Sequence, residues 1–95
     1  MYFDRQGKPL TMWEWTAAFG EDRSIADDVV DGYRVSTVWL GMNHEWRDGY
    51  PPLIFETMVF GRDPWDGYML RYTTEAQAVA GHDQLVARIR QGETP

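Results

Sequence analysis

Tyr33-Arg34-Val35-Ser36-Thr37-Val38-Trp39-Leu40-Gly41 and Leu53-Ile54-Phe55-Glu56-Thr57-Met58-Val59-Phe60 are the two stretches that decide the fold. Both are rich in β-branched and aromatic residues, which favour strands. Both carry apolar residues on both faces, whereas a strand with one solvent-exposed face alternates apolar and polar residues more strictly. We therefore expect a sheet that is covered on both sides, by helices, by long loops or by a second subunit.

Two further segments extend this pair of strands. Residues 25–30, Ile-Ala-Asp-Asp-Val-Val, are predicted to form an edge strand, because charges on an edge discourage aggregation between sheets. Asp31-Gly32, which follows, is a strong signal for a two-residue hairpin turn. Residues 68–72, Tyr-Met-Leu-Arg-Tyr, are predicted to form another strand. The result is an antiparallel meander of three to four strands.

Two pairs of residues match the helix capping box: Thr11 with Glu14, and Thr74 with Gln77. They predict a helix over 12–19 that ends at Gly20, and a second helix that runs to about Arg90. The apolar stripe expected on the second helix comprises Val79, His82, Val86 and Ile89. The sequence thus predicts one α+β domain over residues 1–95, with a short N-terminal helix and a C-terminal helix packed on the sheet.

Charge and cysteine content exclude several functions. The 95 residues include 9 basic and 15 acidic side chains, a net charge of −6, which argues against binding to nucleic acid or to an anionic membrane. The absence of cysteine excludes disulfides, thiolate nucleophiles and Cys-type metal sites. Since no apolar run is long enough to cross a bilayer and the N-terminus lacks the pattern of a signal peptide, we expect a cytoplasmic protein.

Three stretches carry a resemblance to a known family: Ser36-Thr37-Val38-Trp39-Leu40-Gly41 with His44 after it, Pro51-Pro52-Leu53-Ile54-Phe55-Glu56-Thr57-Met58-Val59-Phe60-Gly61, and Tyr72-Thr73-Thr74-Glu75 followed by Ala78, Gly81 and His82. Together with the opening Met1-Tyr2-Phe3-Asp4-Arg5, they resemble small proteins encoded by actinobacteria and their phages. The resemblance implies a phage or mobile-element context and transfers no catalytic role. Phages carry many small acidic proteins that act by binding, including inhibitors of host nucleases and sponges for nucleotide signals.

His44, Glu56 and His82 are the strongest candidates for chemistry. Two imidazoles and a carboxylate can bind zinc and leave a position open for water. No short spacing such as HExxH fixes the three side chains relative to one another. We favour the alternative interpretation, in which Glu56 pairs with Arg71 on a neighbouring strand and His82 is a hydrogen-bonded core histidine.

Binding residues are expected on the strands over 53–60 and 68–72. They are also expected on the loop over 43–50, which precedes the first of these strands. If the face around Glu56 lines a pocket, Arg71 can hold a phosphate or a carboxylate through two hydrogen bonds. The loop over 43–50 contains Trp46 and Arg47, residue types that are enriched at binding hot spots. An alternative is that this loop folds back as a lid over the sheet. Trp39 is expected to join Arg71 and the loop in a pocket.

Three functions follow from these residues. The first is a non-enzymatic binding module, a homo-oligomer that captures a host protein or a small anionic ligand in a counter-defence role. The second is an oligomeric sponge for a nucleotide-like signal, with Trp39, Arg71 and the 43–50 loop at its pocket. The third is a metal-dependent hydrolase that uses His44, Glu56 and His82. We favour the binding module, for which we assign no catalytic residue and expect no cofactor.

Overall fold

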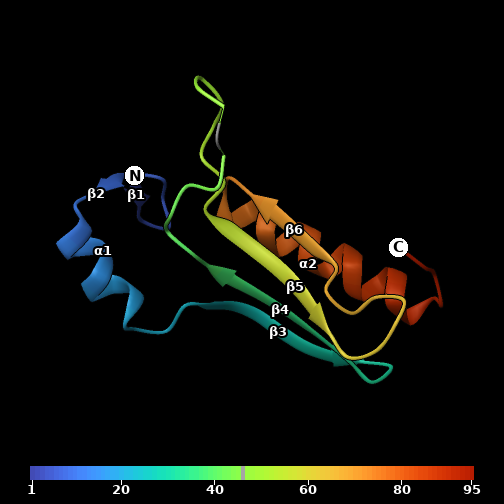
Figure 1. Cartoon of the computed structure of the whole chain (residues 1–95). Coiled ribbons are helices and arrows are strands. Elements are labelled where there is room, and N and C mark those ends of the chain that lie inside the picture. Colours follow the sequence, from blue (N-terminus) through green and yellow to red (C-terminus); the bar gives the residue numbers. More distant parts are fainter. Residues whose placement is uncertain (46) are drawn as a thin grey trace.

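The computed structural model describes residues 1–45 and 47–95 and has the α+β fold that the sequence predicts. Its elements follow in the order β1 (Tyr2–Phe3), β2 (Pro9–Leu10), α1 (Met12–Phe19), β3 (Ser24–Val30), β4 (Tyr33–Trp39), β5 (Phe55–Phe60), β6 (Met69–Tyr72) and α2 (Glu75–Arg90). β3 to β6 form an antiparallel sheet in sequence order, and β1 pairs with β2 in a separate hairpin. In Figure 1, α2 lies behind the four-stranded sheet and α1 stands at one end of the molecule.

The meander is set by its turns and its register. Asp31 and Gly32 both adopt positive φ angles, 49° and 79°, as the tight turn between twisted strands requires. β4 then pairs with β5 so that Thr37 lies opposite Thr57. Glu56 lies opposite Arg71 in the next strand pair. The predicted hairpin and the predicted edge position of β3 are confirmed.

Both capping boxes predicted from the sequence are present. The Thr11 hydroxyl accepts a hydrogen bond from the Glu14 backbone N–H at 3.2 Å. The Thr74 hydroxyl accepts one from the Gln77 N–H at 3.1 Å, and each N3 side chain binds back to its N-cap backbone. These bonds satisfy N–H groups that would otherwise lack partners at the helix start. Among the described residues, no helix has both the length and the apolar character needed to cross a bilayer.

The covered face of the sheet packs against α2. It presents alternate residues of β4 and β5, including Val35, Trp39 and Val59, all of them buried. The buried residues of α2 are Ala78, His82, Leu85, Val86 and Ile89. The predicted stripe was therefore wrong at Val79, which is 42% exposed. One helical turn advances by 3.6 residues, so Ala78 and Leu85 lie nearer the centre of the stripe around His82.

The other side of the sheet, called the open face below, is not covered by any element that the structure describes (Figure 1). Its side chains are Ser24, Asp27, Val29, Arg34, Ser36, Val38, Glu56, Met58, Phe60, Met69 and Arg71. Of the three covers predicted from the sequence, no helix or loop of the described residues lies over this face, whereas a second subunit stays a prediction. The Arg34 guanidinium lies 5.9 Å from the centre of the Phe60 ring on this face, but Phe60 is still 43% exposed and Met69 39% exposed.

The N-terminal unit, β1 to α1, is attached through aromatic contacts. Trp15 stacks on Tyr2 with ring centroids 4.6 Å apart, and it contacts Phe19 at 4.7 Å. The ring centroid of Phe19 lies 6.3 Å from that of Trp39 in the sheet. The Trp15 indole N–H also donates to the Leu40 carbonyl at 2.9 Å. Because no residue of α1 is buried, this short helix depends on these contacts for its position.

Gly81 is predicted to be essential for packing α2. A Cβ at this position would overlap the ring of Tyr72, so Gly81→Ala should lower the free energy of unfolding by ~1–3 kcal/mol despite the better helix propensity of alanine. Gly20→Ala is the matched control, because a Cβ there meets its nearest atoms at an ordinary 3.7 Å. Urea unfolding of both variants tests the prediction. Equal stability of the two would refute it.

Candidate functional site

A chain of five polar side chains runs between α2 and the sheet. Asp28 binds one ring nitrogen of His82, Nε2, at 2.7 Å. The other, Nδ1, lies 2.7 Å from the hydroxyl of Thr37, which contacts the hydroxyl of Thr57. The Tyr72 hydroxyl donates to Thr57 at 3.0 Å and closes the chain. Each of the four strands of the sheet contributes one of these residues, and α2 contributes His82.

The direction of the hydrogen bonds follows from the Asp28 carboxylate. A carboxylate only accepts, so the proton of the ring must lie on His82 Nε2. With a neutral ring, Nδ1 then accepts from Thr37, Thr37 accepts from Thr57, and Thr57 accepts from Tyr72. Every hydroxyl donates once and accepts at least once, except that of Tyr72 at the end of the chain. The buried polar groups are thereby satisfied.

The order of hydroxyl, imidazole and carboxylate is the arrangement used in nucleophilic hydrolysis. Thr37 and His82, however, are fully buried where α2 packs on the sheet. A nucleophile must be reached by its substrate, and the Thr37 hydroxyl is not. The chain of side chains therefore holds the fold together, and His82 is the hydrogen-bonded core histidine of our favoured interpretation.

The predicted pairing of Glu56 with Arg71 is confirmed on the open face. Arg71 Nε lies 3.2 Å from Glu56 Oε2, and the Glu56 side chain is only 15% exposed. A second pair, Asp27 with Arg34, lies on the same face at 2.7 Å. The hydrogen bonds from Arg34 lower the pKa of Asp27 below its usual value. Both acids of the open face thus have an arginine partner.

The loop between β4 and β5 projects away from the sheet (Figure 1). Arg47 pairs with Glu45 at 2.9 Å, and its guanidinium lies 3.9 Å from the centre of the Tyr50 ring. This pairing with Glu45 raises the pKa of Arg47. His44 is half-buried at the base of the loop, and its backbone N–H donates to Leu53. Trp46, a predicted binding residue, lies outside the described residues.

The pocket expected from Trp39, Arg71 and the loop does not form. Trp39 is buried on the covered face, whereas Arg71 lies on the open face. Successive residues of a strand point to opposite sides, and this alternation separates the two side chains. Trp39 instead lines a surface cavity of about 250 Å³ beside the N-terminal unit.

The metal site that we considered as an alternative for His44, Glu56 and His82 is not assembled. Among the described residues, no three His, Asp or Glu side chains lie close enough together to hold a metal ion. Both ring nitrogens of His82 are engaged by Thr37 and Asp28. Glu56 is held by Arg71. The hydrolase hypothesis therefore has no ligand set in the described part of the chain.

Sequence reasoning missed Asp28 and Thr37 as the partners of His82, and it missed Thr57 and Tyr72, which continue the chain beyond Thr37. Two signals could have pointed to them. Thr37 and Thr57 are the polar members of otherwise apolar faces, and a buried hydroxyl needs a partner. Gly81 beside His82 marks a place where α2 closely approaches another residue, here Tyr72.

Thr37→Val is predicted to break the polar chain at its centre while keeping the volume of the side chain. His82 Nδ1 loses its donor and Thr57 loses its acceptor, so the free energy of unfolding should fall by ~1–3 kcal/mol. The control is Thr16→Val on the exposed side of α1, which removes only a hydrogen bond to the Met12 carbonyl. It should change the free energy of unfolding by less than ~0.5 kcal/mol. Chemical denaturation measures both. Similar effects of the two substitutions would contradict a stabilising role for the chain.

Tyr72 should make stability depend on alkaline pH. Burial raises the pKa of its phenol above 10.0 in the folded protein. As pH rises past ~10, the unfolded chain releases this proton while the folded chain keeps it, so stability falls. In urea unfolding between about pH 8 and pH 11, the wild type should lose stability more steeply than Tyr72→Phe, which has no phenol to titrate there. Parallel curves for the two proteins would rule out this linkage.

Comparison of the chain with protein-family models, with curated proteins and with solved structures found no match. The resemblance to proteins of actinobacteria and their phages therefore stays a prediction.

Proposed function

We propose that the chain is a non-enzymatic binding module that works as a homodimer, with its open face packed against a second copy. The observation that carries this proposal is a set of exposed apolar side chains on a sheet face that no described element covers. Phe60 is 43% exposed, Met69 is 39% exposed and Val29 is 76% exposed. Val38 and Met58 are half-buried on the same face. Burial of such residues against another sheet is favourable, and stacked sheets pack about 10 Å apart.

Charge favours a second copy as the occupant. The open face holds two acids and two arginines, paired as Asp27–Arg34 and Glu56–Arg71, so its formal charge is zero. The net charge of −6 therefore lies entirely on the rest of the chain. Two copies with like charge repel each other least when their neutral faces meet, whereas a basic partner would be drawn to the acidic surfaces. In a two-fold contact, the arginines of one copy can also face the acids of the other.

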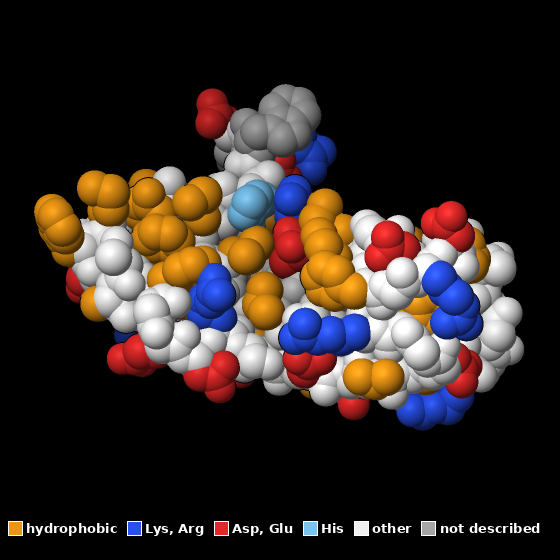
Figure 2. All heavy atoms as spheres, turned by 60° about the horizontal axis from the view of Figure 1, so that its bottom comes forward, with side chains coloured by type: hydrophobic (Ala, Val, Ile, Leu, Met, Phe, Trp, Pro, Cys, Tyr) orange, Lys and Arg blue, Asp and Glu red, His pale blue; other side chains and the backbone are white. Residues whose placement is uncertain are grey.

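The contact is expected to extend beyond the strands. Four strands about 4.8 Å apart, with about six residues rising ~3.3 Å each, form a rectangle of roughly 400 Å². A standard interface takes about 800 Å² of accessible surface from each partner. Hydrophobic side chains also gather over α1 (Figure 2), where Met12 is 55% exposed and Trp13 is 80% exposed. We expect these residues to widen the dimer contact.

The projecting loop is the proposed contact for a host protein. Tyr50 is 54% exposed and lies against the Arg47 guanidinium, so the two side chains support each other. Tyrosine and arginine contribute strongly to protein interfaces. A dimer would present two such loops, and the phage context implied by the resemblance makes a host protein the expected target.

Phe60→Ser combined with Met69→Ser tests the dimer. The wild type should sediment as a dimer at micromolar concentration, and the double variant should have a dissociation constant raised at least about tenfold, since two large apolar side chains leave the interface. Analytical ultracentrifugation over a concentration series measures both constants.

The matched control is Val79→Ser on the outer side of α2, because Val79 is 42% exposed, about as much as Phe60. It should leave the dissociation constant unchanged. A wild type that stays monomeric at the highest concentration would overturn the proposal. So would a double variant that dimerises like the wild type.

A further inference from the structure

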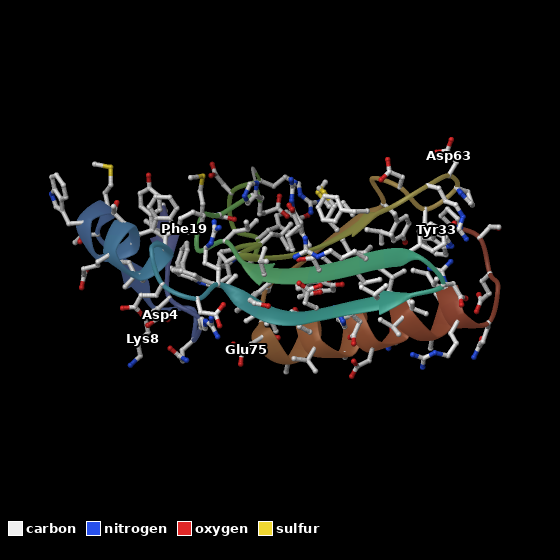
Figure 3. All side chains as sticks on the ribbon, turned by 90° about the horizontal axis from the view of Figure 1, so that it is seen from below. Asp4, Lys8, Phe19, Tyr33, Asp63 and Glu75 are labelled. Atoms are coloured by element: carbon white, nitrogen blue, oxygen red, sulfur yellow. The ribbon has the colours of Figure 1, made fainter. Side chains whose placement is uncertain are left out.

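The open face has a hollow half and an apolar half. On the side of β3 and β4, it contains a hollow of about 280 Å³ whose lining includes Ser24, Asp27 and Ser36. On the side of β5 and β6, Phe60 is 43% exposed and Met69 is 39% exposed. Figure 3 looks at the β3 edge of the sheet and shows α2 on one side of it only, so this helix does not cover the hollow.

The hollow is acidic. Three acids line it, Glu21, Asp22 and Asp27, against two arginines, Arg23 and Arg34, so the formal charge of the lining is −1. The Arg34 guanidinium is engaged by Asp27 through hydrogen bonds of 3.1 and 2.7 Å. The Glu21 side chain makes no hydrogen bond or ion pair within the described part of the chain. The hollow is therefore suited to a cationic group that comes from outside this chain.

The strand register arranges the open-face side chains in three rows that run across the sheet. The rows are Val29–Arg34–Phe60, Asp27–Ser36–Met58–Met69 and Ser24–Val38–Glu56–Arg71. β3 and β6 are the two edges of the sheet. The second and third rows thus begin at the hollow and end on β6, three strand spacings or about 14 Å away.

The geometry of stacked sheets leaves two arrangements for a two-fold dimer. Sheets that pack in the aligned way keep their strand directions within about 30°, so the axis runs nearly across the strands or nearly along them. An axis across the strands, through the middle row, places Asp27 opposite Asp27 of the second copy, and such like-charge contacts are costly. An axis along the strands, through the middle of the sheet, exchanges the two edges and keeps each row in place. Arg71 then faces Ser24 of the second copy, and Met69 faces Asp27.

We infer that the axis runs along the strands and that Arg71 of each copy enters the acidic hollow of the other. The inference rests on the proposed dimer and specifies how its two open faces meet. Arg71 holds Glu56 through Nε at 3.2 Å, which leaves both terminal nitrogens of the guanidinium as donors across the contact. Glu21 gains the partner that its own chain does not supply. Because the contact is two-fold, each of these pairs occurs twice.

Cross-linking between the edge strands distinguishes the two arrangements, and the chain contains no cysteine that would interfere. Asp27→Cys and Met69→Cys place single thiols in the same row, on β3 and on β6. The two variants are mixed, allowed to exchange subunits and treated with a thiol cross-linker that spans about 10 Å, the spacing of stacked sheets. We expect links between the two variants. An axis across the strands would instead link each variant to itself.

Glu21→Gln tests the charge pairing, and Asp83→Asn on the exposed side of α2 is the matched control. Both are exposed acids without a side-chain partner in the described chain, but only Glu21 lines the hollow. The loss of any acid reduces the repulsion between two copies of charge −6, so Asp83→Asn should leave the dissociation constant unchanged or lower it. Glu21→Gln should raise it about three- to tenfold, because two ion pairs are lost per dimer.

A double-mutant cycle assigns the partner of Glu21. In an Arg71→Gln background, Glu21→Gln should no longer weaken the dimer, because the cation that it pairs with is gone. Direct contact within one chain cannot explain such coupling, since Glu21 precedes β3 and Arg71 lies on β6 at the opposite edge. Analytical ultracentrifugation over a concentration series gives the dissociation constants.

The possible failures separate this inference from the proposed function. A wild type that stays monomeric overturns the proposed dimer and this arrangement together. A dimer in which each cysteine variant links only to itself, or not at all, overturns the arrangement alone. So does Glu21→Gln if it dimerises as tightly as Asp83→Asn, or if it weakens the Arg71→Gln protein as much as the wild type.

Discussion

The hydrogen bonds of His82 are the constraint on which the rest of this structure depends. Through Asp28 on one side and Thr37, Thr57 and Tyr72 on the other, they link α2 to every strand of the sheet. Apolar attraction is non-directional, so by itself it resists sliding of a helix along a sheet less sharply than hydrogen bonds do. Fully buried polar groups do not allow such sliding, because a shift of one turn would leave several of them unpaired.

The core consists of two apolar clusters, in addition to this chain of polar side chains. One apolar cluster gathers around Trp65 and Leu85, and the other around Phe55 and Trp39. The second cluster receives the N-terminal unit through the aromatic contacts of Trp15 and Phe19. α2 packs on one face of the sheet, so it leaves the open face uncovered. The cavity beside Trp39 forms where the N-terminal unit meets this second cluster.

Local signals in the sequence predicted most elements and one ion pair. The capping boxes at Thr11 and Thr74 and the turn at Asp31 are short-range chemistry, and all three are as predicted. The pairing of Glu56 with Arg71 was predictable because a carboxylate on an apolar strand needs a partner nearby. The partners of His82 could not be predicted in this way. Threonine is common in strands, so its presence there does not indicate that its hydroxyl has a particular partner. Val79 was misplaced because helical spacing alone leaves the centre of a stripe uncertain by one position.

The sequence by itself determined the secondary structure, the order of the strands and the acidic charge, because these depend on neighbouring residues or on composition alone. Only the tertiary structure decided which face α2 covers, that Trp39 and Arg71 lie on opposite sides, and that His44, Glu56 and His82 do not meet. These outcomes depend on the alternation of strand faces combined with the docking of a distant helix. That docking joins Asp28 to His82 across 54 positions of the chain, a separation over which sequence patterns carry no distance information.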